Sequence, residues 1–136
     1  MTSSAINVVQ AFIAAINRRS PAGIAALMTE DHAFVDSSGR VVSGRQQMTA
    51  GWSAYFGMFP DFTIEVETLL SDGDLVAVFG STTGTFQGKR GPVPENRIEM
   101  PAAWRAIVRD GKVQRWQVYA DWTDGTRRIA EDGAAG

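Results

Sequence analysis

The second half of the chain consists of long segments in which apolar and polar residues alternate, separated by short turn signals. Such alternation, with frequent Val, Thr and aromatic residues, is typical of strands. Four segments share it and are predicted strands: residues 63–70, 75–86, 97–109 and 112–122. The Asp-Gly pairs at 72–73 and 110–111 are typical of tight hairpin turns. Gly80 and Gly84, inside one long strand, indicate that the sheet bends.

The first quarter of the chain predicts two helices followed by a strand. Four apolar residues recur at helical spacing and predict one buried helix face: Val9, Phe12, Ile13 and Ile16. Ser20 before Pro21 predicts the start of the second helix, because the hydroxyl accepts from free N–H groups and proline suits the first helical position. The segment HAFVD, residues 32–36, is a predicted strand that ends on Asp36 at a turn.

A third helix is predicted between residue 43 and Pro60. Ser43 and Gln46 have the spacing of a capping box. A broad apolar face follows at spacings of three and four: Met48, Trp52, Tyr55, Phe56 and Phe59. Three helices before a set of antiparallel strands predict an α+β fold with the helices on one face of the sheet. The 136 residues suit one domain, residues 1–136, of which the polar and Gly/Ala-rich residues 123–136 are expected to be a flexible tail.

Composition excludes several classes of function. Thirteen basic and fifteen acidic residues give a net charge of −2, so no nucleic-acid partner is expected. The chain has no cysteine and one histidine, so we expect neither a metal site nor a cofactor. Met1 to Ser4 lack the basic lead and apolar core of a secretion signal, and no apolar run approaches membrane-spanning length. We therefore expect a cytoplasmic protein with no membrane partner.

Asp36 has two interpretations. A strand that ends on a carboxylate beneath an apolar helix can place an acid in a pocket. Alternatively Asp36 only opens the turn at residues 37–40, because aspartate is common at the first position of a turn. The spacing alone favours the turn.

Twelve residues of the first quarter fall in step, without a gap, with the N-terminal quarter of ketosteroid isomerases: Val8, Val9, Gln10, Ala14, Ala15, Asn17, Gly23, Ile24, Ala26, Leu27, Asp31 and Asp36. On these residues and on its element order, the chain resembles the nuclear transport factor 2-like superfamily, which includes those isomerases and the SnoaL-like polyketide cyclases. The resemblance implies a cystatin-like, cone-shaped α+β fold. Its curved mixed or antiparallel sheet would carry three N-terminal helices on the concave face. The resemblance is specific for fold and less specific for activity, because the superfamily contains enzymes and non-enzymes.

The resemblance to the isomerases implies a base without its oxyanion hole. Asp36 matches the carboxylate that shuttles a proton in those enzymes. Phe12 stands at the position of the tyrosine donor and cannot donate a hydrogen bond. The position of the protonated carboxyl falls on Ala103, or on Trp104 if the hairpin shifts by one residue. Losing one such donor costs about a hundredfold to a thousandfold in rate, so ordinary ketosteroid isomerisation is not expected.

The resemblance to the cyclases and to limonene epoxide hydrolases implies no intact site of either kind. Both place a working aspartate two residues beyond the Trp116 position, where this chain has Val118. The epoxide hydrolases also use an Arg and Asp pair at positions that match Gly80 and Thr82. Asp121 lies on the opposite strand face from Val118 and is expected to cap the strand end.

Nine residues are expected to line a pocket for a small apolar or aromatic ligand: Phe12, His32, Phe34, Trp52, Tyr55, Phe56, Trp104, Trp116 and Val118. Core packing is the alternative for each aromatic residue, and a satisfied, partly buried side chain is the favoured interpretation of His32. Four strand residues also separate His32 from Asp36 by about 13 Å, too far for a direct hydrogen bond.

Three options remain open, the third of which is a structural dimer module with a filled core. In the first, the protein is a cofactor-independent isomerase, cyclase or lyase that acts on a small apolar carbonyl compound. Asp36 would be its base, with a pKa raised by burial. In the second, a non-catalytic protein binds a hydrophobic metabolite in the same pocket. A homodimer is expected in every case, formed by the sheet face that no helix covers, with Trp104 or Trp116 available on it.

Overall fold

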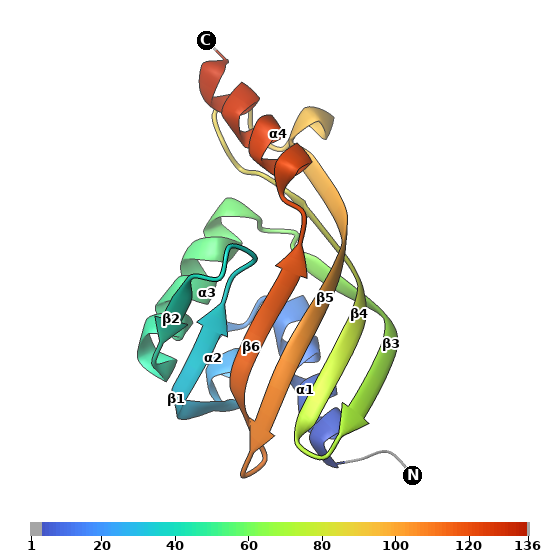
Figure 1. The fold of residues 1–136 in the computed structure, drawn as a ribbon. Helices are drawn as coiled ribbons and strands as arrows, with labels where there is room; N and C mark the ends of the chain where they lie inside the picture. Colours follow the sequence, from blue (N-terminus) through green and yellow to red (C-terminus); the bar gives the residue numbers. More distant parts are fainter. Residues whose placement is uncertain (1–3, 136) are drawn as a thin grey trace.

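The computed structural model describes residues 4–135 (Figure 1). The helices are Ser4–Asn17 (α1), Pro21–Ala25 (α2), Arg45–Met58 (α3) and Thr123–Ala134 (α4), with a short 3₁₀ turn (η1) at Pro94–Asn96. The strands are Met28–Val35 (β1), Val41–Ser43 (β2), Thr63–Asp72 (β3), Leu75–Thr85 (β4), Arg97–Arg109 (β5) and Lys112–Ala120 (β6). Residues 1–3, which carry most of the stretch considered for a secretion signal, and Gly136 lie outside the described residues.

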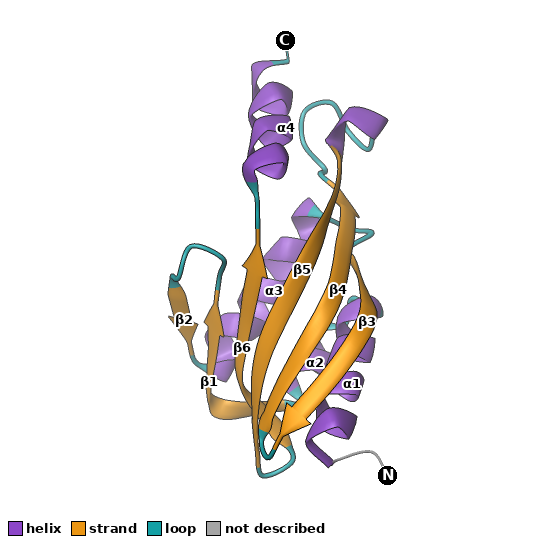
Figure 2. Ribbon diagram, turned by 45° about the vertical axis from the view of Figure 1, so that its right-hand side comes forward, coloured by secondary structure: helices purple, strands orange, loops and turns teal. Residues whose placement is uncertain are grey.

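The strands form one six-stranded sheet in the order β2-β1-β6-β5-β4-β3. β1 runs parallel to β6, and the other neighbouring pairs are antiparallel. The sheet is curved, and α1, α2 and α3 cover one of its faces (Figures 1 and 2). The predicted α+β architecture with a curved mixed sheet is therefore confirmed.

Alternation along β5 separates the core from the outer face of the sheet. The residues of β5 that face the helices are buried: Ile98, Met100, Ala102, Trp104, Ala106 and Val108. Arg97 and Glu99, on the other face, form an exposed ion pair at 3.0 Å. The predicted apolar stripe of α1 completes the core, since Val9, Phe12 and Ile16 are fully buried against this sheet.

Helices α2 and α3 begin in different ways. Ser20 caps α2 as predicted, because its hydroxyl accepts a hydrogen bond from the Gly23 N–H at 3.0 Å. The predicted capping box at Ser43 is wrong. α3 begins one residue later, with Gly44 as its N-cap and no side-chain hydrogen bond to the cap, and Ser43 belongs to β2.

Gly80 lies opposite a β-bulge that bends the edge of the sheet. The pairing of β3 with β4 shifts between Val66, opposite Gly80, and Thr68, opposite Phe79. The extra residue of β3, between Val66 and Thr68, brings the β3 backbone over Gly80. A Cβ atom added at Gly80 would lie 1.9 Å from the Glu65 carbonyl oxygen. The bend predicted from this glycine is therefore present, and it occurs where two backbones approach closely.

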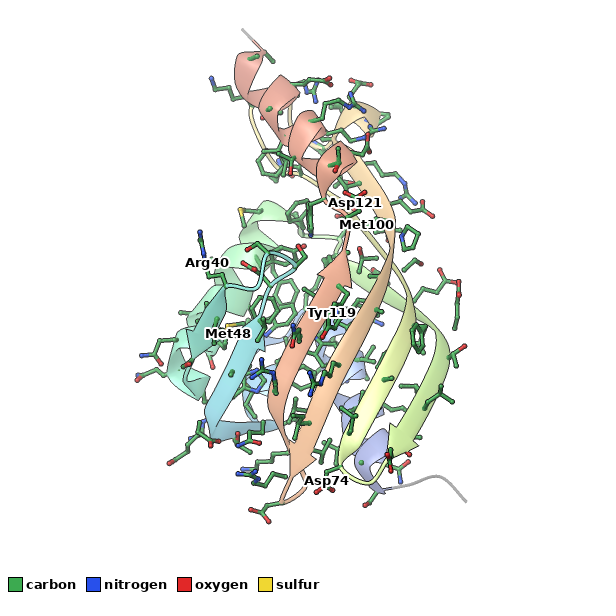
Figure 3. The ribbon with its side chains drawn as sticks, viewed as in Figure 1. Arg40, Met48, Asp74, Met100, Tyr119 and Asp121 are labelled. Carbon is green, nitrogen blue, oxygen red and sulfur yellow. The ribbon has the colours of Figure 1, made fainter. Side chains whose placement is uncertain are left out.

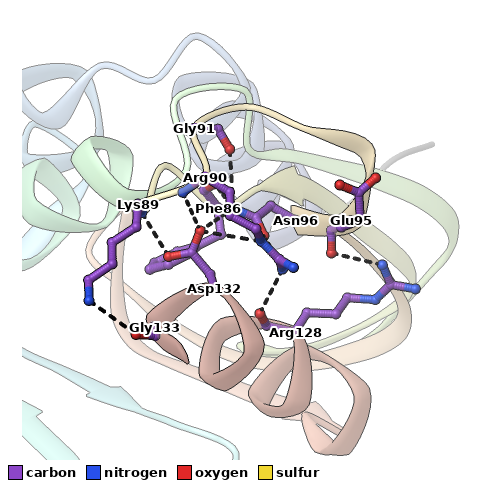
Figure 4. Close-up of polar contacts among 9 residues, drawn as sticks. All are labelled: Phe86, Lys89, Arg90, Gly91, Glu95, Asn96, Arg128, Asp132 and Gly133. Carbon is purple, nitrogen blue, oxygen red and sulfur yellow. Dashed lines mark hydrogen bonds and ion pairs between the residues drawn. The ribbon is translucent and has the colours of Figure 1, made fainter. Parts of the chain in front are cut away.

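The expectation of a flexible tail after residue 122 is wrong, because residues 123–134 form α4. Asp132 is 2% exposed and accepts hydrogen bonds from the Lys89 N–H at 2.8 Å, the Arg90 N–H at 2.7 Å and Asn96 Nδ2 at 2.9 Å (Figure 4). These hydrogen bonds lower the pKa of Asp132 below its usual range, and the bond from Asn96 has the largest effect. α4 is thereby joined to the loop between β4 and β5, a contact between segments far apart in sequence.

The outer face of the sheet differs from the expected one. Trp104 and Trp116 are 4% and 1% exposed and face the helices, so the expectation that either stands on the uncovered face is wrong. The uncovered face instead presents Tyr119 (Figure 3). It also presents Phe79, and both residues pair with Ala103 across neighbouring strands. Among the described residues, no helix is long and apolar enough to cross a membrane.

Candidate functional site

A cavity of about 470 Å³ lies between α3 and the concave face of the sheet. All six strands, α3 and the loop after β1 contribute to its walls. The lining residues are mainly apolar: Phe34, Val42, Met48, Gly51, Trp52, Tyr55, Phe62, Ile64, Met100, Ala102, Trp104, Trp116, Val118, Ala120 and Trp122, with Asp36, Ser37, Ser38 and Thr82. A cavity of this size and lining has the usual properties of a small-molecule site.

A row of small residues across the sheet accounts for the space. Gly80 of β4 pairs with Ala102 of β5, which pairs with Ala120 of β6. These positions share the face on which the neighbouring rows carry larger residues, such as Trp104 and Met100. Ala102 and Ala120 line the cavity, whereas the backbone of β3 covers Gly80. Because the two alanines leave this part of the concave face uncovered, α3 packs over a hollow there.

Two groups of aromatic rings line the cavity. On the side of α3 and β1, the Trp52 ring centroid lies 6.3 Å from that of Phe34 and 6.2 Å from that of Tyr55. On the sheet side, Trp104 and Trp116 stack with their centroids 6.0 Å apart and their planes 20° from parallel. The faces and edges of these rings are the main surface that a ligand would contact.

Asp36 stands at one rim of the cavity and is held by the turn that follows β1. Its Oδ1 accepts hydrogen bonds from the Ser38 N–H at 2.9 Å, the Ser38 hydroxyl at 2.6 Å and the Arg40 N–H at 2.9 Å. Oδ2 makes no hydrogen bond with any other described residue. The turn interpretation is therefore confirmed, and the same carboxylate also lines the cavity.

The expected rise in the pKa of Asp36 is wrong. The hydrogen bond from the Ser38 hydroxyl, helped by the Arg40 and Ser38 N–H groups, lowers the pKa of Asp36 below its ordinary value and outweighs burial. The carboxylate is half-exposed at the rim instead of enclosed beneath the rings. Asp36 is consequently ionised at neutral pH and is a weaker base than a buried carboxylate would be.

The structure brings together many but not all of the predicted pocket residues. Those that line the cavity are Phe34, Trp52, Tyr55, Trp104, Trp116 and Val118. Phe12 of α1 is fully buried in the core, with its ring 5.0 Å from that of Trp116, and does not line the cavity. Phe56 stacks on the far side of Trp52, with the centroids 5.5 Å apart, and does not line the cavity.

His32 is a core residue. It is fully buried, and its Nδ1–H donates a hydrogen bond to the Val113 carbonyl oxygen at 2.7 Å. Burial lowers the pKa of His32, so the imidazole is neutral. Its Nε2 atom has no hydrogen-bond partner among the described residues, which agrees with a neutral ring packed near Phe12.

Besides Ser37 and Ser38 of the turn after β1, two neutral polar side chains, Tyr55 and Thr82, line the cavity. Tyr55 lines it, and burial raises the pKa of Tyr55, so the phenol keeps its proton at every physiological pH. Thr82 is buried on the wall formed by β4. Tyr55 can therefore donate a hydrogen bond to a ligand, and Thr82 can donate or accept one.

Sequence reasoning missed part of the lining. Met100 and Ala102 could have been found, because they alternate in phase with Trp104 along one strand. Phe62 and Trp122 follow the ends of α3 and β6 and carry no periodic signal.

Among the described residues, no group of three or more His, Cys, Asp or Glu side chains could hold a metal ion.

The family model described as a SnoaL-like domain matches residues 9–116, which is most of the chain. The match includes most of α1, all of α3, and β1 to β5 with the first half of β6, which together carry most of the cavity lining. The comparison with curated proteins gives no significant match.

Solved structures with the same fold cover nearly the whole chain. An LEH-like epoxide hydrolase of M. tuberculosis is 18% identical, with a TM-score of 0.78, over 98% of this chain and 95% of that one. A protein of ketosteroid isomerase-like fold from Catenulispora acidiphila, in complex with trimethylamine, is 21% identical, with a TM-score of 0.76, over 93% and 92% of the two chains. TerC, co-crystallised with polyporic acid, is 21% identical, with a TM-score of 0.76, over 98% and 100%. At these identities the likeness is one of fold.

Proposed function

Because the chain belongs to the family of SnoaL-like domains, we propose that it binds a small, mostly apolar molecule in the cavity under α3. One observation carries the proposal: a hollow of about 470 Å³ has apolar and aromatic walls and a single carboxylate at its rim. Apolar walls supply most of the binding free energy through burial, and the few polar groups orient the ligand.

The similar structures support a small molecule as the ligand class. The Catenulispora acidiphila protein was solved with trimethylamine and TerC with polyporic acid. One of these molecules is an amine and the other an acid, so the fold alone does not select the charge of a ligand. Selection in this chain must come from its own lining residues.

Filling the cavity is expected to abolish binding. Ala102→Trp places an indole in the row of small residues and should weaken the binding of a neutral probe, 6-propionyl-2-(dimethylamino)naphthalene, by on the order of a hundredfold. The probe becomes brighter and bluer in apolar surroundings, so a fluorescence titration measures its dissociation constant.

Ala103→Trp is the matched control for this titration, because Ala103 is the next residue of β5 and points to the outer face. It should leave the dissociation constant unchanged. Ala102→Leu should give an intermediate loss, which keeps the test informative if the larger side chain prevents folding. Equal probe binding by the wild type and a folded Ala102→Trp protein would refute the proposed site.

A second candidate function is acid/base catalysis, in which Asp36 removes a proton from a small apolar carbonyl compound. The observation in its favour is that Asp36 lines the cavity while its Oδ2 is not engaged by another described residue. Tyr55 would be the donor to the developing oxyanion, because its phenol is neutral and lines the same cavity. Either function requires the same cavity, so the two differ only in what Asp36 does.

We also propose that the protein is a homodimer that associates through the outer face of the sheet. Phe79 and Tyr119 are 46% and 47% exposed there, on either side of Ala103. Large exposed aromatic side chains on one uncovered face are typical of association surfaces.

Light scattering is expected to give twice the chain mass for the wild type, and Tyr119→Glu is expected to shift the measured mass towards that of the monomer. Only monomers of the wild type at high concentration would contradict the dimer.

A further inference from the structure

The charge carried by the cavity lining is of one sign, negative. Among the described residues that line the cavity, Asp36 is the only one with a charged side chain, and none is Lys, Arg or His. The nearest basic residue in sequence is Arg40, which is exposed in the turn and is not part of the lining. Its charge is the smallest of the effects that lower the pKa of Asp36. Ionised Asp36 therefore gives the cavity a net negative charge that no neighbouring lining residue balances.

The free oxygen of Asp36 is the one available to a ligand. Oδ1 already accepts three hydrogen bonds from its own turn, whereas Oδ2 accepts none from the described residues. Because the turn fixes the carboxylate, contact with a ligand would not require the side chain to give up an existing bond. This arrangement suits an electrostatic contact in which the carboxylate stays ionised.

Sheet register places Trp104 at about the same level of the sheet as Asp36. Val35 pairs with Gln117, so Asp36, the next residue, comes level with Val118. Val118 in turn pairs with Trp104, which stacks on Trp116. Strands are about 4.8 Å apart, so Asp36 and Trp104 lie two strand spacings from each other on one level. A group of a few ångströms between them would contact both the carboxylate and the indoles.

We infer that the ligand of this cavity is an organic cation, an apolar alkyl or aryl amine whose ammonium group lies between Asp36 and the indoles of Trp104 and Trp116. The inference rests on the proposed function and adds the charge of the ligand to it. The tryptophan faces attract a cation through their quadrupoles, and more strongly when water is excluded. The remaining apolar lining accepts the hydrocarbon part.

The alternatives are disfavoured on electrostatic grounds. An anionic ligand would meet the Asp36 carboxylate at close range with no cation in the lining to offset the repulsion. A neutral apolar ligand would displace water from Asp36 and return no interaction to its charge. The low pKa of Asp36 supports the same conclusion, because the carboxylate keeps its charge throughout the neutral range.

Three probes of similar shape separate these cases: benzyltrimethylammonium, its neutral isostere neopentylbenzene, and the anion phenylacetate. Each competes with the fluorescent naphthalene probe in the wild type, in Asp36→Asn and in Asp121→Asn. Asparagine keeps an oxygen that can accept from Ser38 and Arg40, so the turn is retained. Asp121 is the matched control, because its Oδ1 accepts from the Thr123 N–H and hydroxyl in the same way, and it does not line the cavity.

Asp36→Asn is expected to weaken binding of benzyltrimethylammonium by about tenfold or more and to leave neopentylbenzene within about twofold of the wild type. Asp121→Asn should change neither, although it alters the net charge of the protein equally. An unchanged affinity of Asp36→Asn for the cation, or tighter binding of phenylacetate than of the cation by the wild type, would overturn the inference.

The outcomes also separate this inference from the proposed function. If neopentylbenzene or the naphthalene probe enters the wild-type cavity and benzyltrimethylammonium does not, the cavity remains a binding site and the cation inference fails. If no probe of any charge binds, the proposed function itself fails.

Discussion

Gly80→Ala is expected to lower the free energy of unfolding by about 3 kcal/mol or more. The added Cβ would lie 1.9 Å from the Glu65 carbonyl oxygen and 3.0 Å from its carbonyl carbon. Both atoms belong to the backbone of β3 at the bulge, so no side-chain rotation relieves the clash. The strands would have to separate at the point where the sheet bends over the cavity. Urea denaturation followed by circular dichroism measures the change.

Gly84→Ala is the control for that experiment, since it lies four residues further along the same strand. Its Cβ would contact the Phe59 ring at 3.2 Å, and a side chain can move where a backbone cannot. Neither glycine has a left-handed backbone conformation, so the two substitutions differ in the space available and not in backbone strain. A loss for Gly84→Ala equal to that for Gly80→Ala would show that the bulge is not the cause.

Asp36→Asn is expected to abolish any turnover of a carbonyl substrate, with a fall in kcat of about a hundredfold to ten-thousandfold. The amide cannot take up a proton, yet it can still accept the hydrogen bonds from Ser38 and Arg40 that shape the turn. Single-turnover kinetics with a candidate substrate, at saturating concentration, separates this loss from weaker binding. Asp121→Asn is again the control.

The pH dependence of such turnover follows from the direction of the shift. A base acts in its deprotonated form, and the lowered pKa keeps Asp36 deprotonated below its ordinary value of 3.8. The rate should therefore stay constant from neutral pH down to at least that value, as long as the protein remains folded. An acid limb near pH 6, or turnover that survives Asp36→Asn, would assign the base to another group.

Local sequence patterns were sufficient for most of the elements. The alternation of β5 predicted its full length, residues 97–109, and the helical spacing of α1 predicted its buried face. Ser20 before Pro21 predicted the cap of α2. These features depend on neighbouring residues along one strand or helix, where the side-chain period and the capping chemistry act over a few positions.

α4 had no comparable local signal. Its segment is polar and rich in Gly and Ala, and its helix is joined to the fold through Asp132, which meets the loop at Lys89 and Arg90 some forty residues earlier. The start of α3 was displaced by one residue for a related reason, because pairing of Ser43 with Ala33 in the sheet outweighs its use as a cap.

Some features of the cavity also follow from local sequence, and others follow only from tertiary structure. The sequence alone determined that Asp36 lies at the end of a strand, where a turn begins, and that Trp52, Trp104 and Trp116 belong to apolar faces; the strand itself ends at Val35. Only the tertiary structure decided that Ala102 and Ala120 lie side by side and leave a cavity, that His32 is buried in the core, and that hydrogen bonds lower the pKa of Asp36. The reason is physical: a residue's face follows from the local period, whereas cavities and pKa values follow from strand register and long-range packing, which no short segment contains.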